Sequence, residues 1–310
     1  MRAFIFPGQG SQAVGMGADL AAASAAARDV FQEVDEAIGQ NLFRLMTEGP
    51  EADLTLTENA QPAIMANAIA TLRVLEREGG VKLADHAAFV AGHSLGEYAA
   101  LCAAGALDLA TTARLLKLRG RAMQSAVPVG IGAMAALLGA TLDQAQAIAE
   151  KAAEGEVCTV ANDNAAGQVV LSGHKGAIER AVALCREFGV KKGMLLPVSA
   201  PFHCPLMQPA ADAMAEALAG ASVMAPFVPL YANVLAAPIA APEEIRSRLV
   251  EQVTGMVRWR ESVLAMADAG VAQFVELGAK VLGPMVKRTV EAEPLSVVTM
   301  AEIEALAKAL

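Results

Sequence analysis

Short apolar runs separated by longer amphipathic stretches predict an α/β protein. Strands are expected at three such runs: residues 3–6, 87–91 and 273–277. The first two runs lead into glycine-containing loops, and helical patterns follow both loops. A helix of small residues after the second loop runs to Ala104 and stops at Gly105, because glycine favours the end of a helix. Such alternation is typical of a parallel sheet covered by helices.

The middle of the chain has an order of its own. The pattern there predicts a strand, a helix, two strands, a helix and a last strand, at residues 131–138, 142–153, 157–162, 168–172, 175–188 and 192–198. This β-α-β-β-α-β order is the ferredoxin-like arrangement. We therefore expect residues 128–199 to form a small ferredoxin-like domain. It would be inserted into a large α/β domain made of residues 1–127 and 200–310.

Composition and charge restrict the expected cellular location and the expected binding partners. Of 310 residues, 55% are hydrophobic, but the longest apolar stretch, residues 127–142, contains three glycines and is shorter than the roughly 20 residues of a membrane span. The first residues lack the apolar region of a signal peptide, so we expect a cytoplasmic protein without membrane contact. The net charge of −9 argues against a nucleic-acid partner. An acidic protein partner would need only a local basic patch.

The four cysteines give no sign of a metal site. Cys102, Cys158, Cys185 and Cys204 form no Cys-x-x-Cys pair and have no zinc-like spacing with histidine. We expect scattered reduced thiols and no metal. Cys204 directly follows a histidine, and neighbouring side chains diverge, so we interpret it as a packing residue.

Ser94 is the leading candidate for a nucleophile. Gly92-x-Ser94-x-Gly96 stands between a predicted strand and a predicted helix, which is the pattern of a nucleophile elbow. Glycine keeps the turn tight, and the N–H of Leu95 at the helix start would point at a developing oxyanion. The elbow favours an α/β-hydrolase-like large domain with a parallel sheet. A glycine-flanked turn with a capping serine is the alternative.

A serine nucleophile needs a base, and the sequence offers four histidines. His86 would lie more than about 20 Å from Ser94, at the other end of the strand. His93 adjoins the serine, so it is badly placed to take the proton, although it can line the pocket. His174 falls in a turn of the small domain. His203, in a proline-flanked loop where the large domain resumes, is the expected base, and a structural loop histidine is the alternative.

The helix predicted at residues 108–124 carries an arginine on its apolar face. Arg114, Lys117 and Arg121 share one face, whereas Arg119 falls among leucine, alanine and methionine on the other. An unpaired buried charge is costly, so Arg119 needs an anionic partner. The pattern leaves two candidates open: an Asp or Glu of the protein, or a substrate carboxylate held by two parallel N–H···O bonds.

These residues lie in segments that resemble the malonyl-CoA:acyl carrier protein transacylases of type II fatty-acid synthesis. The resemblance covers essentially the whole chain, and the order and spacing of its motifs match that family. The motifs are Phe6-Pro-Gly-Gln-Gly-Ser-Gln12, Gly92-His-Ser-Leu-Gly-Glu-Tyr98, Arg119-Gly120, Ala161-Asn-Asp-Asn164 with Gly167-Gln-Val-Val170, Pro197-Val-Ser-Ala-Pro-Phe-His203 and Leu249-Val-Glu-Gln252.

The resemblance implies an acyltransferase and assigns its catalytic groups. Ser94 would be the nucleophile and His203 the base. The N–H groups of Gln9 and Leu95 would form the oxyanion hole. Arg119 would hold the free carboxylate of a malonyl group.

The resemblance further implies that a backbone carbonyl at or near Gln252 orients the base in place of the acid of a Ser-His-Asp triad.

The resemblance also implies the substrate and the partner. His93, Asn162 and Gln252 would join Arg119 in substrate binding. The enzyme would pass malonyl from malonyl-CoA to the phosphopantetheine thiol of acyl carrier protein through a malonyl-serine, with no cofactor. We expect a monomer that binds the carrier transiently.

Two features depart from the usual family pattern. Phe202 precedes the histidine where several type II members have a smaller polar residue, and a Phe-His pair resembles malonyl-selective acyltransferase domains of polyketide and animal-type synthases. Residues 276–282 form a segment that is one residue shorter than the family's Gly-Pro-Gly-Lys loop.

Other functions remain open at this point. A free-standing acyltransferase that serves a polyketide synthase would share all of the chemistry. A serine esterase or thioesterase would pass the acyl group to water, and a scaffold or carrier-binding module would have no activity. Docking of an acidic carrier would need local positive charge, for which Lys191-Lys192 and Lys287-Arg288 are the candidates.

Overall fold

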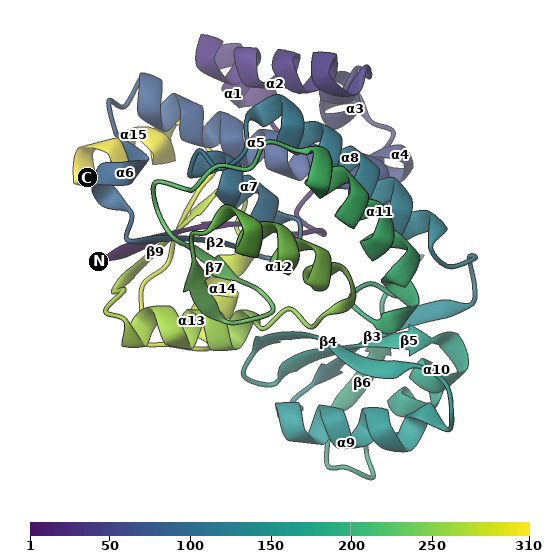
Figure 1. The fold of residues 1–310 in the computed structure, drawn as a ribbon. Coiled ribbons are helices and arrows are strands. Elements are labelled where there is room, and N and C mark those ends of the chain that lie inside the picture. The colour runs from purple at the N-terminus through teal and green to yellow at the C-terminus, as the bar shows by residue number, and fades with distance from the viewer. Residues whose placement is uncertain (199) are drawn as a thin grey trace.

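Two β-sheets organise the chain. The computed structural model describes residues 1–198 and 200–310, so the expected end of the small domain, at Ser199, lies outside the described residues. A six-stranded sheet has the strand order β10-β9-β1-β2-β7-β8, and a four-stranded sheet has the order β4-β5-β3-β6 (Figure 1). The protein is therefore an α/β protein with one mixed and one antiparallel sheet.

The larger sheet is parallel except at one edge. Its strands are β1 (Arg2–Phe6), β2 (Phe89–Gly92), β7 (Leu230–Ala232), β8 (Ala237–Ile239), β9 (Gln273–Leu277) and β10 (Leu295–Val297). All of its neighbours pair in parallel except β7 and β8. The expectation of a parallel sheet is thus wrong for β8. The four residues between β7 and β8 form a hairpin, and a connection that short joins only antiparallel strands.

Both faces of the larger sheet are covered by helices. Along β1, Phe4 and Phe6 face one core, and Ala3 and Ile5 face the other. The first core contains residues of α5 (Thr57–Arg77), α7 (Gly96–Ala103) and α8 (Leu109–Ser125), and the second contains residues of α13 (Trp259–Asp268) and α14 (Leu282–Lys287) (Figure 1). Because both faces are buried, the strands have continuous apolar sequences.

The remaining helices complete these layers. They are α1 (Ala18–Ala23), α2 (Ala25–Ile38), α3 (Leu42–Glu48), α4 (Glu51–Thr55), α6 (Leu83–His86), η1 (Pro205–Met207), α11 (Gln208–Gly220), α12 (Pro242–Thr254) and α15 (Met300–Ala309). Within the described residues, no helix combines the length and the apolar character needed to cross a membrane.

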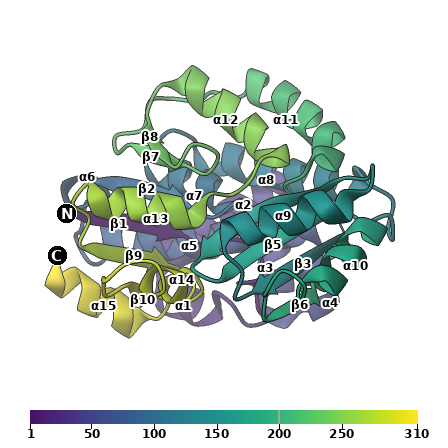
Figure 2. The ribbon, with the colours of Figure 1, turned by 90° about the horizontal axis from the view of Figure 1, so that it is seen from below.

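The smaller sheet is built from one continuous segment in the predicted order. Its strands are β3 (Gly132–Leu138), β4 (Cys158–Ala165), β5 (Gln168–His174) and β6 (Lys192–Leu195), and all pairs are antiparallel. Helices α9 (Leu142–Ala153) and α10 (Lys175–Leu184) share a separate apolar core with this sheet. Figure 2 shows them packed along it, beside the larger sheet.

Several predicted boundaries are wrong. The strand expected to reach residue 198 ends at Leu195, because proline at 197 cannot donate to a sheet ladder. The helix expected to reach residue 188 ends at Leu184. His86 ends the short helix α6 instead of starting a strand, since β2 begins only at Phe89.

A short bridge holds the smaller sheet against the larger layer. Asn162 pairs in parallel with Val257, a residue just before α13. The adjacent Asp163 is buried, and its carboxylate forms an ion pair with Arg260 of α13 at 2.9 Å. The bridge therefore fixes the position of β4, and with it Asn162, relative to the larger sheet.

Candidate active site

Ser94 occupies a strained turn between β2 and α7. Its φ is 54°, a left-handed conformation that few residues other than glycine adopt. A Cβ added to Gly92 would lie 1.9 Å from the carbonyl oxygen of Gly96, and a Cβ added to Gly96 would lie 2.2 Å from that of Phe6. Only glycine fits at either position. The turn is therefore as tight as the sequence predicts, and it presents Ser94 at the carboxyl end of β2.

Asn233 holds this turn from the neighbouring strand. Its Oδ1 accepts a hydrogen bond from the Ser94 N–H at 2.8 Å, and its Nδ2 donates to the Gly92 carbonyl at 2.7 Å. The side chain is buried, directly after β7. The sequence analysis missed Asn233, because a single asparagine after a short strand gives no signal of its own.

The structure brings Ser94 and His203 together. Ser94 Oγ lies 2.7 Å from His203 Nε2, and His203 Nδ1 lies 2.8 Å from the backbone oxygen of Gln252. A carbonyl oxygen only accepts, so Nδ1 carries the ring proton and Nε2 is left to accept from the serine hydroxyl. Among the described residues, no carboxylate contacts the imidazole.

His203 is held in its neutral form. Burial, followed by the positive charge of Arg119, lowers its pKa from the usual 6.5 to about 3. The residue has a φ of 57°, so it shares the left-handed conformation of Ser94. A neutral imidazole with a free Nε2 lone pair has the form that a general base requires at neutral pH.

Arg119 lies beside the serine with only neutral hydrogen-bond partners. It is 1% exposed. One terminal nitrogen donates to Gln61 Oε1 at 2.9 Å, and the other donates to Gln252 Oε1 at 2.7 Å and to Ser94 Oγ at 3.1 Å. Within the described part of the chain, no Asp or Glu forms an ion pair with it. Of the two partners left open by the sequence, the protein carboxylate is therefore excluded there.

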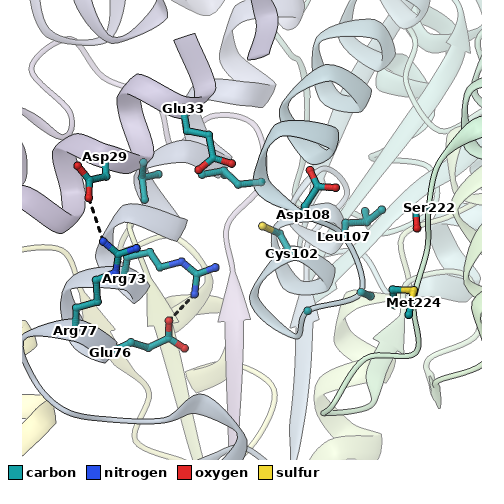
Figure 3. A pocket seen from close by; sticks show the side chains of 14 residues that line it. Asp29, Glu33, Arg73, Glu76, Arg77, Cys102, Leu107, Asp108, Ser222 and Met224 are labelled. Atoms are coloured by element: carbon teal, nitrogen blue, oxygen red, sulfur yellow. Dashed lines mark hydrogen bonds and ion pairs between the residues drawn. The ribbon is translucent and has the colours of Figure 1, made fainter. Parts of the chain in front are cut away.

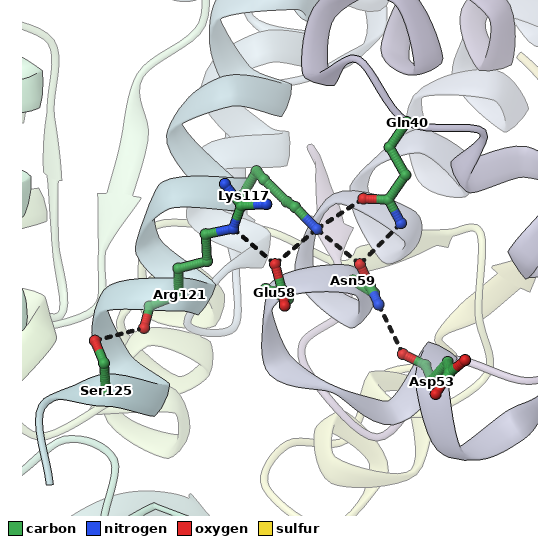
Figure 4. A network of polar contacts seen from close by, with 7 residues as sticks. All are labelled: Gln40, Asp53, Glu58, Asn59, Lys117, Arg121 and Ser125. Carbon is green, nitrogen blue, oxygen red and sulfur yellow. Dashed lines mark hydrogen bonds and ion pairs between the residues drawn. The ribbon is translucent and has the colours of Figure 1, made fainter.

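Lys117 is buried, which the helical wheel of α8 alone does not indicate. Its Nζ contacts Gln40, Asn59 and Glu58 at 2.7, 2.8 and 2.9 Å (Figure 4). Lys117 and Arg121 share one face of α8, as predicted, and both pair with Glu58 of α5. Lys117 is buried where α5 packs over this part of α8. A helical wheel shows which residues of one helix share a face, but it does not show which of them a neighbouring helix will bury.

The close contact of α5 and α8 also positions Gln61. A Cβ added to Gly120 would lie 2.5 Å from the Cα of Glu58, so glycine permits the two backbones to approach. Gln61, one turn further along α5, then reaches Arg119. The sequence analysis missed Gln61, although a glutamine within the apolar residues of a helix is the kind of buried polar group that marks a site.

Ser94, His203 and Arg119 line a cavity of about 400 Å³ between the two sheets. Gln9, His93 and Asn162 line it, together with Phe202. Further lining residues are Gly10, Gln12, Thr55, Gln61, Met123, Met134, Leu196, Pro197 and Val198. Gln252 does not line the cavity and lies behind His203 and Arg119.

Two further placements concern the expected oxyanion hole and His93. The N–H groups of Gln9 and Leu95 make no hydrogen bond within residues 1–198 and 200–310, and Leu95 stands at the start of α7. His93 Nε2 is 2.7 Å from Asn164 Oδ1, and burial lowers the pKa of the ring. His93 is therefore engaged with β4 and not with Ser94.

His174 and Cys204, which were not expected to take part in catalysis, make their contacts away from Ser94. His174 Nδ1 accepts from the Val157 N–H at 2.9 Å, within the smaller sheet. Cys204 is buried, and its Sγ donates to the Pro201 carbonyl at 3.1 Å. The described residues contain no cluster of His, Cys, Asp and Glu able to hold a metal ion.

A larger cavity, of about 550 Å³, lies at the opposite end of α7 (Figure 3). Its arginines are paired with its own acids, Arg73 with Glu76 and Arg77 with Asp29. Burial raises the pKa of its Cys102 thiol to about 11. With no histidine among its described lining residues, this cavity lacks the nucleophile and base found beside Arg119.

Comparison with known proteins decides the family. The sequence matches the acyl transferase domain family over residues 3–303. The chain belongs to this family. A malonyl CoA-acyl carrier protein transacylase of Escherichia coli strain K12 is 44% identical over 309 residues, which is 99% of this chain and 98% of the relative.

Solved structures of acyltransferases share the whole fold. An acyl-carrier-protein-S-malonyltransferase from Bartonella henselae is 50% identical, with a TM-score of 0.97 over 99% of this chain and 98% of its own. A malonyl-transacylase in complex with a type II PKS acyl-carrier protein is 39% identical, with a TM-score of 0.95 over 100% of this acyltransferase and 99% of its own chain.

The lowered pKa of His203 makes a prediction about the acid limb of this acyltransferase. A histidine with an ordinary pKa of 6.5 would be protonated below about pH 6 and could then no longer act as a base. Because His203 stays neutral, kcat/KM for the acyl-CoA donor should remain constant down to about pH 5, as measured by initial rates with circular dichroism at each pH as a control for folding. A decrease with a midpoint near 6.5 in the folded enzyme would contradict this account.

Proposed function

We propose that the chain transfers a malonyl group from malonyl-CoA to the phosphopantetheine thiol of acyl carrier protein, for fatty-acid synthesis. The observation that carries this proposal is Arg119: a buried guanidinium, 3.1 Å from the serine oxygen, with only neutral partners in the described residues. Such a charge calls for an anion, and the free carboxylate of malonyl supplies one. A neutral acyl ester would leave the charge unpaired, which speaks against an esterase.

The first half of the reaction forms a malonyl-serine. His203 Nε2 takes the proton of Ser94 as Oγ attacks the thioester carbon. The N–H groups of Gln9 and Leu95 stabilise the resulting oxyanion. When the C–S bond breaks, the imidazolium returns its proton to the sulfur of CoA. The serine ester and free CoA are the products.

The second half repeats these steps with another thiol. His203, again neutral, takes the proton of the phosphopantetheine thiol as its sulfur attacks the ester. The same two N–H groups stabilise the oxyanion, and Ser94 leaves as its proton returns. Such a ping-pong route requires no metal or redox cofactor. Arg119 holds the malonyl carboxylate in both halves, with His93 and Asn162 completing the substrate site. Gln252, expected from the resemblance to bind substrate, lies outside the cavity and instead supports Arg119 and His203.

We also propose a finer description of the fold. The elbow on a mainly parallel sheet supports an α/β-hydrolase-like large domain, of residues 1–127 and 200–310. The strand order β4-β5-β3-β6 and the β-α-β-β-α-β sequence order support a ferredoxin-like domain at residues 128–199. The enzyme would act in the cytoplasm as a monomer that binds its carrier transiently.

A second candidate function is service to a polyketide synthase. It rests on the similarity to the malonyl-transacylase solved with a type II PKS acyl-carrier protein. The chemistry at Ser94 would be the same. Relative kcat/KM for purified fatty-acid and polyketide carrier proteins separates the two functions.

Arg119→Ala tests the proposed substrate. Without the guanidinium, the malonyl carboxylate has no partner in the buried site, so kcat/KM for malonyl-CoA should fall by about 100-fold or more, whereas acetyl transfer should fall much less. Arg114→Ala, on the exposed side of the same helix, is the matched control and should behave as wild type. An unchanged preference for malonyl over acetyl would refute the role of Arg119.

Charge reversal tests the proposed docking surface for the carrier protein. Lys191 and Lys192 are exposed at the edge strand β6, which leads into the cavity-lining residues 196–198. Lys287 instead pairs with Glu293, and Arg288 contacts Gln168. Charge reversal of both Lys191 and Lys192 to Glu should raise KM for the acidic carrier several-fold, and leave KM for malonyl-CoA unchanged.

The matched control for this variant is charge reversal of Lys82 and Lys308. Both lysines are exposed: Lys82 directly precedes α6, and Lys308 is in the last turn of α15. These two helices lie at the other end of the molecule from the smaller sheet (Figure 1). If both double variants change KM for the carrier equally, overall charge and not a docking site is responsible, and the assignment is wrong.

A further inference from the structure

The side chain of Gln252 connects the groups that the proposed function uses. Its Nε2 donates to the backbone oxygen of Ser94 at 2.9 Å and to Glu97 Oε2 at 2.6 Å. Its Oε1 accepts from Arg119 at 2.7 Å, and its backbone oxygen faces His203. The orientation of one amide therefore bears on the nucleophile, the base and the expected carboxylate ligand.

Glu97 helps to decide which way this amide points. An amide rotated by half a turn would present its NH₂ group to Arg119, and two donors would then face each other. Glu97 and the Ser94 carbonyl accept both N–H bonds, which leaves Oε1 facing the guanidinium. Glu97 itself is 1% exposed and stands one helical turn after Ser94, so its position is fixed by the elbow.

The same amide separates two groups of opposite charge. Glu97 and Arg119 are both buried, yet within the described residues they form no ion pair, because Gln252 bonds to each of them. Burial raises the pKa of Glu97 to about 8, so the carboxyl group is mostly uncharged at pH 7. The positive charge of Arg119 thus remains available to a ligand.

We propose that Glu97 is a positioning residue that sets the preference for carboxylated acyl groups, by aiming the Gln252 side chain at Arg119. It touches neither the acyl group nor the reacting atoms. The proposal rests on the function proposed above and goes beyond it, because it assigns selectivity to a residue outside the cavity lining.

The test is Glu97→Met, which keeps the length and removes the acceptor. Freed from Glu97, the amide no longer holds Arg119 in one orientation, so the ratio of kcat/KM for malonyl-CoA to that for acetyl-CoA should fall about tenfold, mainly through KM for malonyl-CoA. Glu97→Gln, which keeps an acceptor oxygen, should restore most of the ratio. A Glu97→Met enzyme with the wild-type ratio would overturn the proposal.

Glu276→Gln is the matched control for a merely structural effect. Glu276 is also a fully buried glutamate, but it accepts from the N–H groups of Val281, Leu282 and Gly283 and from Ser296, away from the cavity. This variant should lower thermal stability without changing the malonyl/acetyl ratio. If Glu97→Met lowers both rates alike, as a loss of stability would, the proposal is also wrong.

A pH measurement keeps the test open if Glu97→Met does not fold. Among the described residues, the titratable groups around Glu97 are Arg119 and Tyr98, and burial raises the pKa of Tyr98, so Glu97 is the one of these three that changes charge near pH 8. Its ionisation should oppose the binding of malonyl only, so the wild-type malonyl/acetyl ratio should fall between about pH 7 and 9. The ratio of Glu97→Gln should stay flat.

A ratio that falls equally in both proteins overturns the proposal. The ratio cancels pH effects that the two donors share, such as titration of CoA. Wild-type enzyme that transfers neither acyl group would instead refute the proposed function, so the two failures are distinguishable.

Discussion

The left-handed backbone at Ser94 is the constraint on which the site depends. A non-glycine residue in this conformation costs about 1–3 kcal/mol and persists only where the surroundings impose it. Here two glycines allow β2 and α7 to approach, and Asn233 bonds to the Ser94 N–H and to the Gly92 carbonyl. The turn directs Oγ toward His203, which has the same backbone conformation. Nucleophile and base thus meet through two strained residues held by neutral hydrogen bonds.

Neutral partners also explain how a histidine and an arginine coexist beside one serine. A carboxylate behind His203 would lie close to Arg119 and would compete with a substrate carboxylate for it. The backbone oxygen of Gln252 orients the imidazole without adding a charge. The nearest buried acid, Glu97, is separated from the guanidinium by the Gln252 amide. Among the residues that the structure describes, the site therefore keeps the positive charge of Arg119 without a paired negative charge, which suits a dicarboxylic acyl group.

Local signals made much of this predictable from the sequence. Helix α9 begins where a capping box of Thr141 and Gln144 requires it, and it has the predicted bounds. The glycines around Ser94 encode the elbow within five residues. The pairing of Ser94 with His203 could be predicted by elimination among four histidines, but contacts between distant residues outside any motif could not. The burial of Lys117 depends on Glu58, Asn59 and Gln40, and the clamp on Ser94 depends on Asn233, more than a hundred residues away. The antiparallel edge strand β8 was likewise missed, because the hairpin that connects it to β7 contains no glycine to signal a turn.

The central claim is that Ser94 carries the malonyl group, and the intact mass of the protein tests it most directly. Wild-type protein would be incubated with malonyl-CoA in the absence of a carrier, in parallel with Ser94→Ala. The account predicts a stable adduct of one malonyl group on the wild type, removed by hydroxylamine and absent from the variant. Steady release of CoA with no adduct, or an adduct of equal size on Ser94→Ala, would contradict it.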